Sequence, residues 1–231
     1  MLKKLLWPEV CPFCGKVSRE GICPACEKIL SKLRVKGPKC LKCGKPVNAV
    51  EQEYCYDCRN SKHYFEKGIS VWLHQPPVTT SIYQFKYHNQ RAFAKIFAEK
   101  TIAYYGNEIR DFHADCIVPV PLHTLRKRMR GYNQAEVLAK EIGKKMQINV
   151  RADLVKRVRY TAPQKKLDSF SRKQNLKGAF RLCGNMKGIR RVLIVDDIYT
   201  TGSTIDEIAR ILKEKGAENV IFLTISIGQG Y

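Results

Sequence analysis

Four short, largely apolar runs divide the chain after residue 65, at 68–74, 116–120, 192–195 and 219–228. Runs of this kind are typical of strands that are buried on both faces of a parallel sheet. The last three alternate with helical patterns, an order that suits right-handed crossovers within one sheet. The pattern therefore predicts an α/β fold with a parallel sheet for residues 65–231.

Amphipathic spacing predicts the helices that accompany these strands. Helices are expected at 78–89 and 91–105, from near Asn133 with Glu136 at capping-box spacing, and from about Thr204 to Gly216. The segment 155–181 is polar and basic with little periodicity, which predicts a loop. The apolar helix positions expected in the core are Phe93, Ile96, Phe97, Ile102, Ala135, Leu138, Ala139, Ile142, Met146, Ile205, Ile208, Ala209 and Leu212.

Residues 1–62 form a separate region with eight of the ten cysteines, arranged as four C-x-x-C pairs. Its two halves open with the similar phrases CPFCGK and CLKCGKP, and each closes with a second pair, which makes an internal repeat. Paired C-x-x-C motifs at these spacings indicate tetrahedral zinc, and disulfides are the alternative. So small a module depends on metal to fold, and four thiolates leave no open catalytic position.

The sequence leaves open whether this module holds one zinc ion or two and how the pairs combine. Sequential sites are favoured over interleaved ones, with the short amphipathic segment 27–33 linking the halves. Cys116 and Cys183 stand alone and are interpreted as ordinary hydrophobic residues. The expected ligands are Cys11, Cys14, Cys23 and Cys26 in one site and Cys40, Cys43, Cys55 and Cys58 in the other.

Charge adds a hypothesis about partners. The 231 residues include 42 Lys and Arg against 21 Asp and Glu, a formal charge of +21. Eight thiolates on two zinc ions would leave roughly +17, which still favours polyanions such as nucleic acid. A lysine-rich solubilising surface, or the high charge content typical of a thermophile, is the alternative.

The apolar runs are too short for membrane insertion. No run reaches 18 apolar residues, and the apolar start of the chain ends at Pro8. We therefore expect no membrane insertion and a cytoplasmic location.

The most informative stretch is RVLIVDDIYTTGST, residues 191–204. An apolar run ends at Asp196 and Asp197, and a hydroxyl-rich turn with Gly202 then leads into a helix. Backbone N–H groups and hydroxyls at a helix N-terminus favour a phosphate monoester, whereas carboxylates accept hydrogen bonds from ribose hydroxyls. Together they predict a ribose 5-phosphate site, and an ordinary acidic strand-to-helix turn is the alternative. The phosphate-binding residues would be Thr200, Thr201, Gly202, Ser203 and Thr204.

A second anion site is expected after the strand at 116–120, where residues 122–134 read LHTLRKRMRGYNQ. We interpret this stretch as a basic loop between a strand and a helix, placed at the same sheet edge. Arg126, Arg128 and Arg130 would bind a pyrophosphate, together with Lys86 from the helix at 78–89. A solvated basic loop is the alternative.

The stretch 191–204 resembles the phosphoribosyl-pyrophosphate (PRPP) motif of type I phosphoribosyltransferases. The resemblance implies a Rossmann-like core and Mg²⁺ held largely by the ligand's own oxygens. It also implies that Asp196 and Asp197 are catalytic residues that bind the ribose hydroxyls. The place of residues 155–181 corresponds to a hood over PRPP, and Gln164 and Arg172 resemble residues of the amidophosphoribosyltransferase hood. A basic loop without catalytic duty is the alternative. Leu2 stands where those enzymes carry a nucleophilic cysteine, so glutamine hydrolysis is not expected.

The phrase VPVPLHTLRKRMRGYNQAEVLA, the stretch 161–180 and the cysteine-rich start together resemble ComF-family competence proteins. Eight cysteines are more than a single four-cysteine finger needs. The resemblance implies a role in natural transformation, with single-stranded DNA and other DNA-uptake proteins as partners. Tyr54, Tyr56, Tyr64 and Tyr132 lie beside basic residues and could stack bases.

Three functions follow from these patterns. The first is a PRPP-dependent phosphoribosyltransferase, an enzyme that binds PRPP or a related ribose phosphate. The second is a PRPP-binding protein that serves DNA uptake and contacts single strands, and the two are compatible. The third is a PRPP sensor that regulates. We expect the first two together; an active phosphoribosyltransferase of nucleotide metabolism without a DNA role, or the sensor, remains the alternative.

Overall fold

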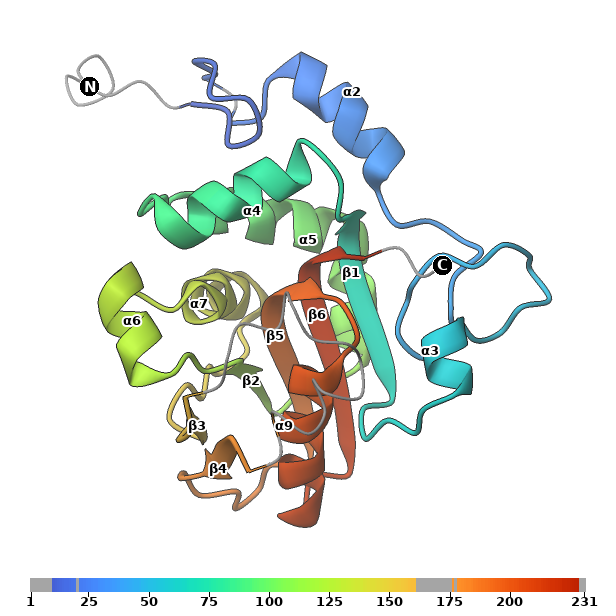
Figure 1. Cartoon of the computed structure of the whole chain (residues 1–231), viewed down its shortest axis with the longest axis vertical. Helices are drawn as coiled ribbons and strands as arrows, with labels where there is room; N and C mark the ends of the chain where they lie inside the picture. Colours follow the sequence, from blue (N-terminus) through green and yellow to red (C-terminus); the bar gives the residue numbers. More distant parts are fainter. Residues whose placement is uncertain (1–9, 20, 161–175, 177, 229–231) are drawn as a thin grey trace.

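The computed structural model describes residues 10–19, 21–160, 176 and 178–228. Its centre is a four-stranded parallel sheet in the order β1-β6-β5-β2 (Figure 1). The strands are β1 (Lys67–Leu73), β2 (Cys116–Pro119), β5 (Arg191–Tyr199) and β6 (Asn219–Ile227). Each strand overlaps one of the four apolar runs, so the expected α/β fold is confirmed.

β5 carries apolar side chains on both of its faces, and helices therefore cover both faces of the sheet. Leu193 and Val195 pack in the core beside α5 (Phe93–Asp111) and α7 (Gln134–Met146). Val192 and Ile194 pack in a second core beside α9 (Ser203–Glu214). The helix α4 (Val78–Tyr87) lies on the α5 side, and its Phe85 joins the first core. The four expected helices are therefore present.

One expected loop contains a helix, α6 (Thr124–Arg130). The His123 side chain accepts a hydrogen bond from the Leu125 N–H at 3.3 Å, and Gly131 ends the helix in the left-handed region at φ 76°. No residue of α6 is buried, so the segment has no apolar stripe from which periodicity could have indicated a helix. The prediction of a simple basic loop was wrong at this point.

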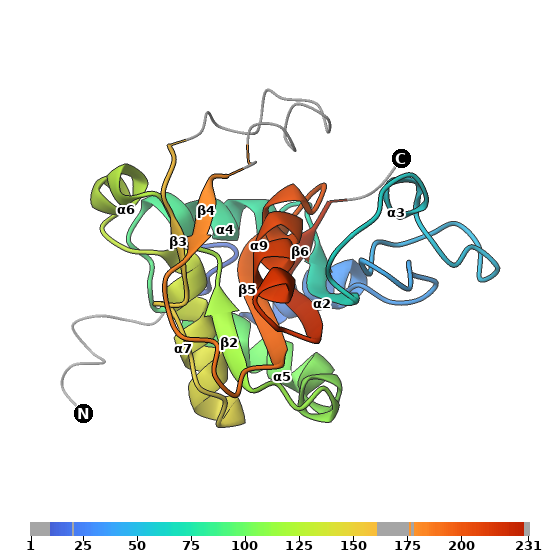
Figure 2. The ribbon, with the colours of Figure 1, turned by 90° about the horizontal axis from the view of Figure 1, so that it is seen from below.

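The segment 155–181 is also more ordered at its ends than its composition suggested. The antiparallel pair β3 (Val155–Arg157) and β4 (Phe180–Leu182) lies beyond β2, next to α6 (Figure 2). Short strands of three residues give no alternation that a sequence pattern can detect. The hood residues Gln164 and Arg172 lie outside the described residues.

The helix α7 begins as its sequence suggested, with one difference. The Asn133 side chain caps it by accepting a hydrogen bond from the Ala135 N–H at 3.1 Å. The Glu136 carboxylate does not complete a capping box but pairs with Lys140 at 2.7 Å and with Lys127 at 3.4 Å. Glu136 therefore connects α7 to the basic helix α6.

The two halves of the cysteine-rich region pack on different parts of the sheet domain. The first half lies over α4, and the second lies beyond β1 with the short helix α3 (Tyr56–Arg59). The helix α2 (Pro24–Leu33) connects them, as expected for the segment 27–33. Phe13 of the first half packs edge-on against Trp72, with ring centroids 5.5 Å apart. In the second half, the Lys42 carbonyl accepts a hydrogen bond from the Gly68 N–H of β1 at 2.8 Å.

Among the described residues, no helix combines the length and the apolar character that crossing a bilayer would require.

Candidate ribose-phosphate site and cysteine clusters

A cavity of about 630 Å³ lies at the carboxyl ends of β2 and β5. Its position follows from the topology: the helix after β2 covers one sheet face and the helix after β5 covers the other. The two connecting loops therefore diverge and leave a crevice between them. The residues discussed below that line it are His74, Lys86, Tyr87, Arg126, Arg130, Gln134, Arg157, Tyr160, Asp196, Asp197, Tyr199, Thr200, Gly202, Ser203 and Thr204.

Both predicted acids lie in this cavity, on a strand that runs on to Tyr199 instead of ending at Val195. Asp197 is 4% exposed, and its Oδ2 lies 2.9 Å from Nζ of Lys86 on α4. Asp196 Oδ1 accepts a hydrogen bond from the Asp197 N–H at 2.8 Å. Burial raises the pKa of Asp196 to about 8; the neighbouring Asp197 adds to the shift and Lys86 opposes it.

The predicted phosphate loop, residues 200–204, leads into the N-terminus of α9. Gly202 has a φ of 78°, and a Cβ atom at this position would lie 2.5 Å from the Tyr199 hydroxyl. The position therefore requires glycine for both its conformation and its space. Thr201 and Ser203 share a hydrogen bond between their hydroxyls at 3.0 Å. The N-terminus of α9 lies at the cavity, and its first backbone N–H groups favour the binding of an anion there.

The predicted cations divide into two groups. Lys86, Arg126 and Arg130 line the cavity, whereas Arg128 is exposed and does not. Arg126 and Arg130 are four positions apart on α6 and share one face, but Arg128 projects from the opposite face. Arg130 is held in place by hydrogen bonds to Gln134 at 3.1 Å and to the Tyr87 hydroxyl at 3.0 Å. The structure thus brings three of the four predicted cations into one cavity.

Other cavity residues escaped the sequence patterns. Arg157 belongs to β3, and burial, with the neighbouring Arg126, lowers its pKa to about 10. His74 follows β1 and shares a hydrogen bond with the Ser226 hydroxyl of β6 at 2.8 Å. Tyr87 and Tyr160 contribute aromatic rings to the cavity lining. His74 could have been predicted, because it directly follows an apolar strand. Arg157 could not, because the polar segment around it has no recognisable pattern.

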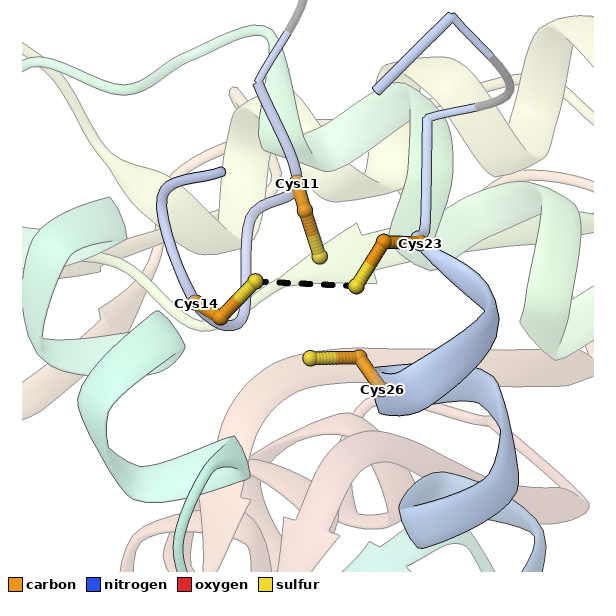
Figure 3. Close-up of side chains that lie close together, drawn as sticks. All are labelled: Cys11, Cys14, Cys23 and Cys26. Carbon is orange, nitrogen blue, oxygen red and sulfur yellow. Dashed lines mark hydrogen bonds between the residues drawn. The ribbon is translucent and has the colours of Figure 1, made fainter. Parts of the chain in front are cut away.

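The eight cysteines form two clusters of four, each built from sequential pairs. Within each cluster the ligand atoms all lie within 4.8 Å of one another. Sγ of Cys14 and Cys23 are 3.6 Å apart, as are those of Cys43 and Cys55. Tetrahedral zinc with bonds of about 2.3 Å places sulfurs about 3.8 Å apart, so both clusters fit the ion. In Figure 3 the four sulfurs of the first cluster point toward a common centre.

The same backbone turn builds the first knuckle of both clusters. Gly15 and Gly44 have φ values of 75° and 76°, and their N–H groups donate to Cys11 and Cys40 carbonyls at 2.9 Å. Cys23 lies at the N-terminus of α2, and the Cys26 backbone N–H is the main reason that its pKa is lowered to about 7. A lowered pKa favours the thiolate that zinc binds. The preference for sequential sites is confirmed, and the cluster count supports two zinc ions.

Comparison with known proteins agrees with this arrangement. Residues 86–227 match the phosphoribosyl transferase domain family, and residues 2–59 match the double zinc ribbon domain. Competence protein F of Haemophilus influenzae is 32% identical over 209 residues, which cover 88% of this chain and 89% of that protein. DNA utilization protein YhgH of Escherichia coli K12 is 32% identical, with 87% of each chain covered.

Competence protein ComFC of Bacillus subtilis is 26% identical over 208 residues, with 85% of this chain and 80% of that protein covered. The relatives therefore extend across both the cysteine-rich region and the sheet domain. The chain belongs to the ComF family of proteins, which join a double zinc ribbon to a phosphoribosyltransferase domain.

Proposed function

We propose that the chain binds PRPP with Mg²⁺ in the 630 Å³ cavity and acts as a phosphoribosyltransferase in the handling of DNA. One observation carries the ligand assignment. The cavity combines a helix N-terminus, two carboxyl groups and three cations, which are the groups that suit the phosphate, the diol and the pyrophosphate of PRPP.

The residues divide the ligand among them. The loop 200–204 and the N-terminus of α9 receive the 5-phosphate. Asp196 and Asp197 accept hydrogen bonds from the ribose hydroxyls. Lys86, Arg126 and Arg130, together with Arg157, neutralise the pyrophosphate. Mg²⁺ would be held largely by the oxygens of the ligand and would withdraw charge from the pyrophosphate.

Transfer would break the bond between the anomeric carbon and pyrophosphate and form a bond from that carbon to a nucleophile. The carbon gains positive charge in the transition state, and an ionised carboxylate at Asp196 or Asp197 would stabilise it. The cations stabilise the leaving pyrophosphate, which takes the bonding electron pair. Lys86 would be shared between Asp197 and the ligand, because it reaches both from α4.

Titration calorimetry tests the assignment. Mg²⁺-PRPP is titrated into the wild type, into Asp196→Asn/Asp197→Asn, and into the control Asp153→Asn/Glu218→Gln. The control removes two carboxyl groups as well, but at positions shortly before β3 and β6. We expect binding in the wild type and control and none in the double acid variant. Binding that survives in the acid variant, or is absent from the wild type, would contradict the assignment.

A DNA role is supported by the relatives' names and by a surface beside the cavity. Tyr83 and Tyr87 of α4 are 54% and 52% exposed, and their ring centroids are 5.0 Å apart. The Arg130 guanidinium lies 4.7 Å from the Tyr87 ring centroid. One turn earlier on the same face of α6, Arg126 lies 5.4 Å from the ring centroid of the exposed Tyr160. We call these five residues the rim.

Exposed rings beside arginines stack bases and attract phosphates, so the rim suits single-stranded DNA. Tyr132, one of the four tyrosines considered from the sequence, is 5% exposed and cannot stack a base. We expect Tyr83→Ala/Tyr87→Ala to weaken affinity for a labelled oligonucleotide by about 1–3 kcal/mol per stacked base. Affinity should also fall steeply with salt.

The matched control is Tyr54→Ala/Tyr56→Ala, which removes two exposed rings from the second zinc ribbon. Fluorescence anisotropy at several salt concentrations compares the two variants. A loss in the control variant instead of the rim variant would move the binding surface to the ribbon. Absence of binding by the wild type at low salt would contradict the DNA role.

A further inference from the structure

The second cysteine cluster lies directly behind the phosphate loop, and Tyr199 joins the two. Tyr199 is 1% exposed and packs in the same core as Cys43 and Cys55. Its ring stacks on Phe222 with centroids 4.6 Å apart and planes 3° from parallel. Nζ of Lys45, two residues after the second ligand of the cluster, lies 5.9 Å from the Tyr199 ring centroid. The cluster therefore forms part of the pocket that fixes this ring.

The ring in turn supports the loop. Tyr199 immediately precedes the phosphate loop, and its hydroxyl lies where a Cβ atom on Gly202 would be only 2.5 Å away. Among the described residues, this buried hydroxyl has no hydrogen-bond partner. Its position is therefore set by the packing of the ring. A displacement of the ring would be transmitted to Gly202 and to the first turn of α9.

A second connection reaches the same helix. The chain leaves the cluster after Cys58, and the Tyr64 N–H donates a hydrogen bond to Asp206 Oδ1 at 2.6 Å. Nδ1 of His63 lies 3.5 Å from the same carboxylate oxygen. Asp206 is in the first turn of α9, directly after the phosphate loop. The end of the ribbon is thus fixed to the helix whose N-terminus receives the phosphate.

The geometry of both connections depends on the four thiolates being held together. Lys45 follows the first knuckle and Asp57 belongs to the second, yet the two form an ion pair at 2.5 Å with Lys45 almost fully buried. Four thiolates this close repel one another unless a cation binds them. With zinc bound, the two knuckles stay together and the Lys45–Asp57 pair stays beside Tyr199.

The first cluster offers a contrast within the same chain. Its neighbour Phe13 packs against Trp72 and Phe97, with ring centroids 5.5 and 6.0 Å away. These residues belong to the core on the opposite face of the sheet from α9. The two clusters share their ligands and knuckle turns but differ in what they support.

We propose that zinc at Cys40, Cys43, Cys55 and Cys58 preorganises the phosphate loop through Tyr199 and Asp206, so that zinc binding at this cluster and ribose-phosphate binding strengthen each other. Tyr199 is then a positioning residue. The inference rests on the proposed ribose-phosphate site. Because coupling between two sites is reciprocal, a ligand in the cavity must also slow the loss of this zinc and leave the zinc of the first cluster unaffected.

Zinc release from the full chain tests the coupling. A chromogenic chelator records the rate of zinc release in the presence of ribose 5-phosphate. The control is the rate in the presence of ribose, which lacks the phosphate. Cys26→Ser and Cys58→Ser, at equivalent positions of the two clusters, identify the two kinetic phases. The Cys58→Ser variant lacks one of the two kinetic phases. We expect ribose 5-phosphate to make this phase roughly tenfold slower in the wild type, which is within the usual range of coupling. Equal slowing of both phases, or of neither, would overturn the proposal.

Calorimetry with ribose 5-phosphate separates this outcome from failure of the proposed function. If the wild type does not bind ribose 5-phosphate, both the site and the coupling are overturned. If it binds and neither zinc phase changes, only the coupling is overturned.

Variants of the linking residue test the route. We expect Tyr199→Leu to keep both zinc ions but to weaken ribose 5-phosphate binding roughly tenfold, and Tyr199→Phe to restore it. Phe97→Leu is the packing control, because it shortens a fully buried ring in the core on the other face of the sheet, away from Tyr199. An equal loss of affinity in Phe97→Leu would show general damage to the core and contradict a route through Tyr199.

Discussion

The raised pKa of Asp196 gives the site a measurable signature in the absence of any ligand. In the folded protein this pKa is about 8, mainly because of burial and secondly because of Asp197. In the unfolded chain an aspartate titrates near 3.9, so the group is ionised there at any pH above about 6. The folded state therefore binds more protons than the unfolded state near neutral pH, and stability falls as the pH rises through 8.

The size of the effect follows from this pKa. Between pH 7 and pH 9 the folded Asp196 changes from about nine-tenths protonated to about one-tenth, which lowers the free energy of unfolding by about 1.4 kcal/mol. Asn at this position has no proton to lose. We therefore expect the stability of Asp196→Asn relative to the wild type to increase by that amount, equivalent to roughly 3–5 °C in Tm for a chain of this size.

Thermal unfolding at pH 7, 8 and 9, with constant ionic strength and zinc, measures the difference between the two proteins. Subtracting the free energy of unfolding of one protein from that of the other at each pH cancels the contribution of the titratable groups that both contain. Asp153→Asn is the control, because the Arg151 side chain lowers the pKa of Asp153 and this group stays ionised across the range. If the wild type and Asp196→Asn lose stability in parallel, the protonation of Asp196 inferred from the cavity is wrong.

Three further changes have defined outcomes. Lys86→Met should lower the free energy of unfolding by about 3 kcal/mol in chemical denaturation, because it leaves its buried partner carboxylate unpaired; an unchanged midpoint would contradict this. Gly202→Ala should abolish calorimetric ribose 5-phosphate binding, whereas Gly188→Ala, with a similar φ of 75° but open space around it, should show only backbone strain of about 1–2 kcal/mol. Arg130→Ala should weaken Mg²⁺-PRPP binding roughly tenfold, as expected for a lost charged hydrogen bond, and the matched variant Arg128→Ala should not. Elemental analysis of the purified chain should find two zinc ions per molecule, and a single ion would contradict the two-cluster arrangement.

The sequence predicted those elements whose pattern reflects burial. The run Val192–Val195 is apolar at successive positions because one face of β5 meets α7 and the other meets α9. The cysteine pairs were equally readable, since zinc geometry restricts their spacing. The helix α6 was not readable, because it buries no residue and so carries no periodic signal.

Residues that meet only in three dimensions were the hardest to predict. Arg157 lies in a segment without a pattern, and its place in the cavity depends on the pairing of β3 with β4. The role of Arg128 also needed the structure, because helical geometry separates it from Arg126 and Arg130. Likewise, the repeat showed that the two ribbon halves are alike but not that they pack on different parts of the sheet domain.

The position of β6 between β1 and β5 has a consequence for how the chain acquires its structure. Ile69 of β1 lies opposite Leu223 of β6, and these partners are separated by most of the sequence. On a ribosome, β1 and the ribbon that contacts it are synthesised long before residues 219–227 exist to join them to the sheet. The cysteine clusters can load metal early, but the apolar faces that surround them must wait for the last strand. Pairings so distant in sequence form slowly, so the nascent chain exposes these faces for a long interval.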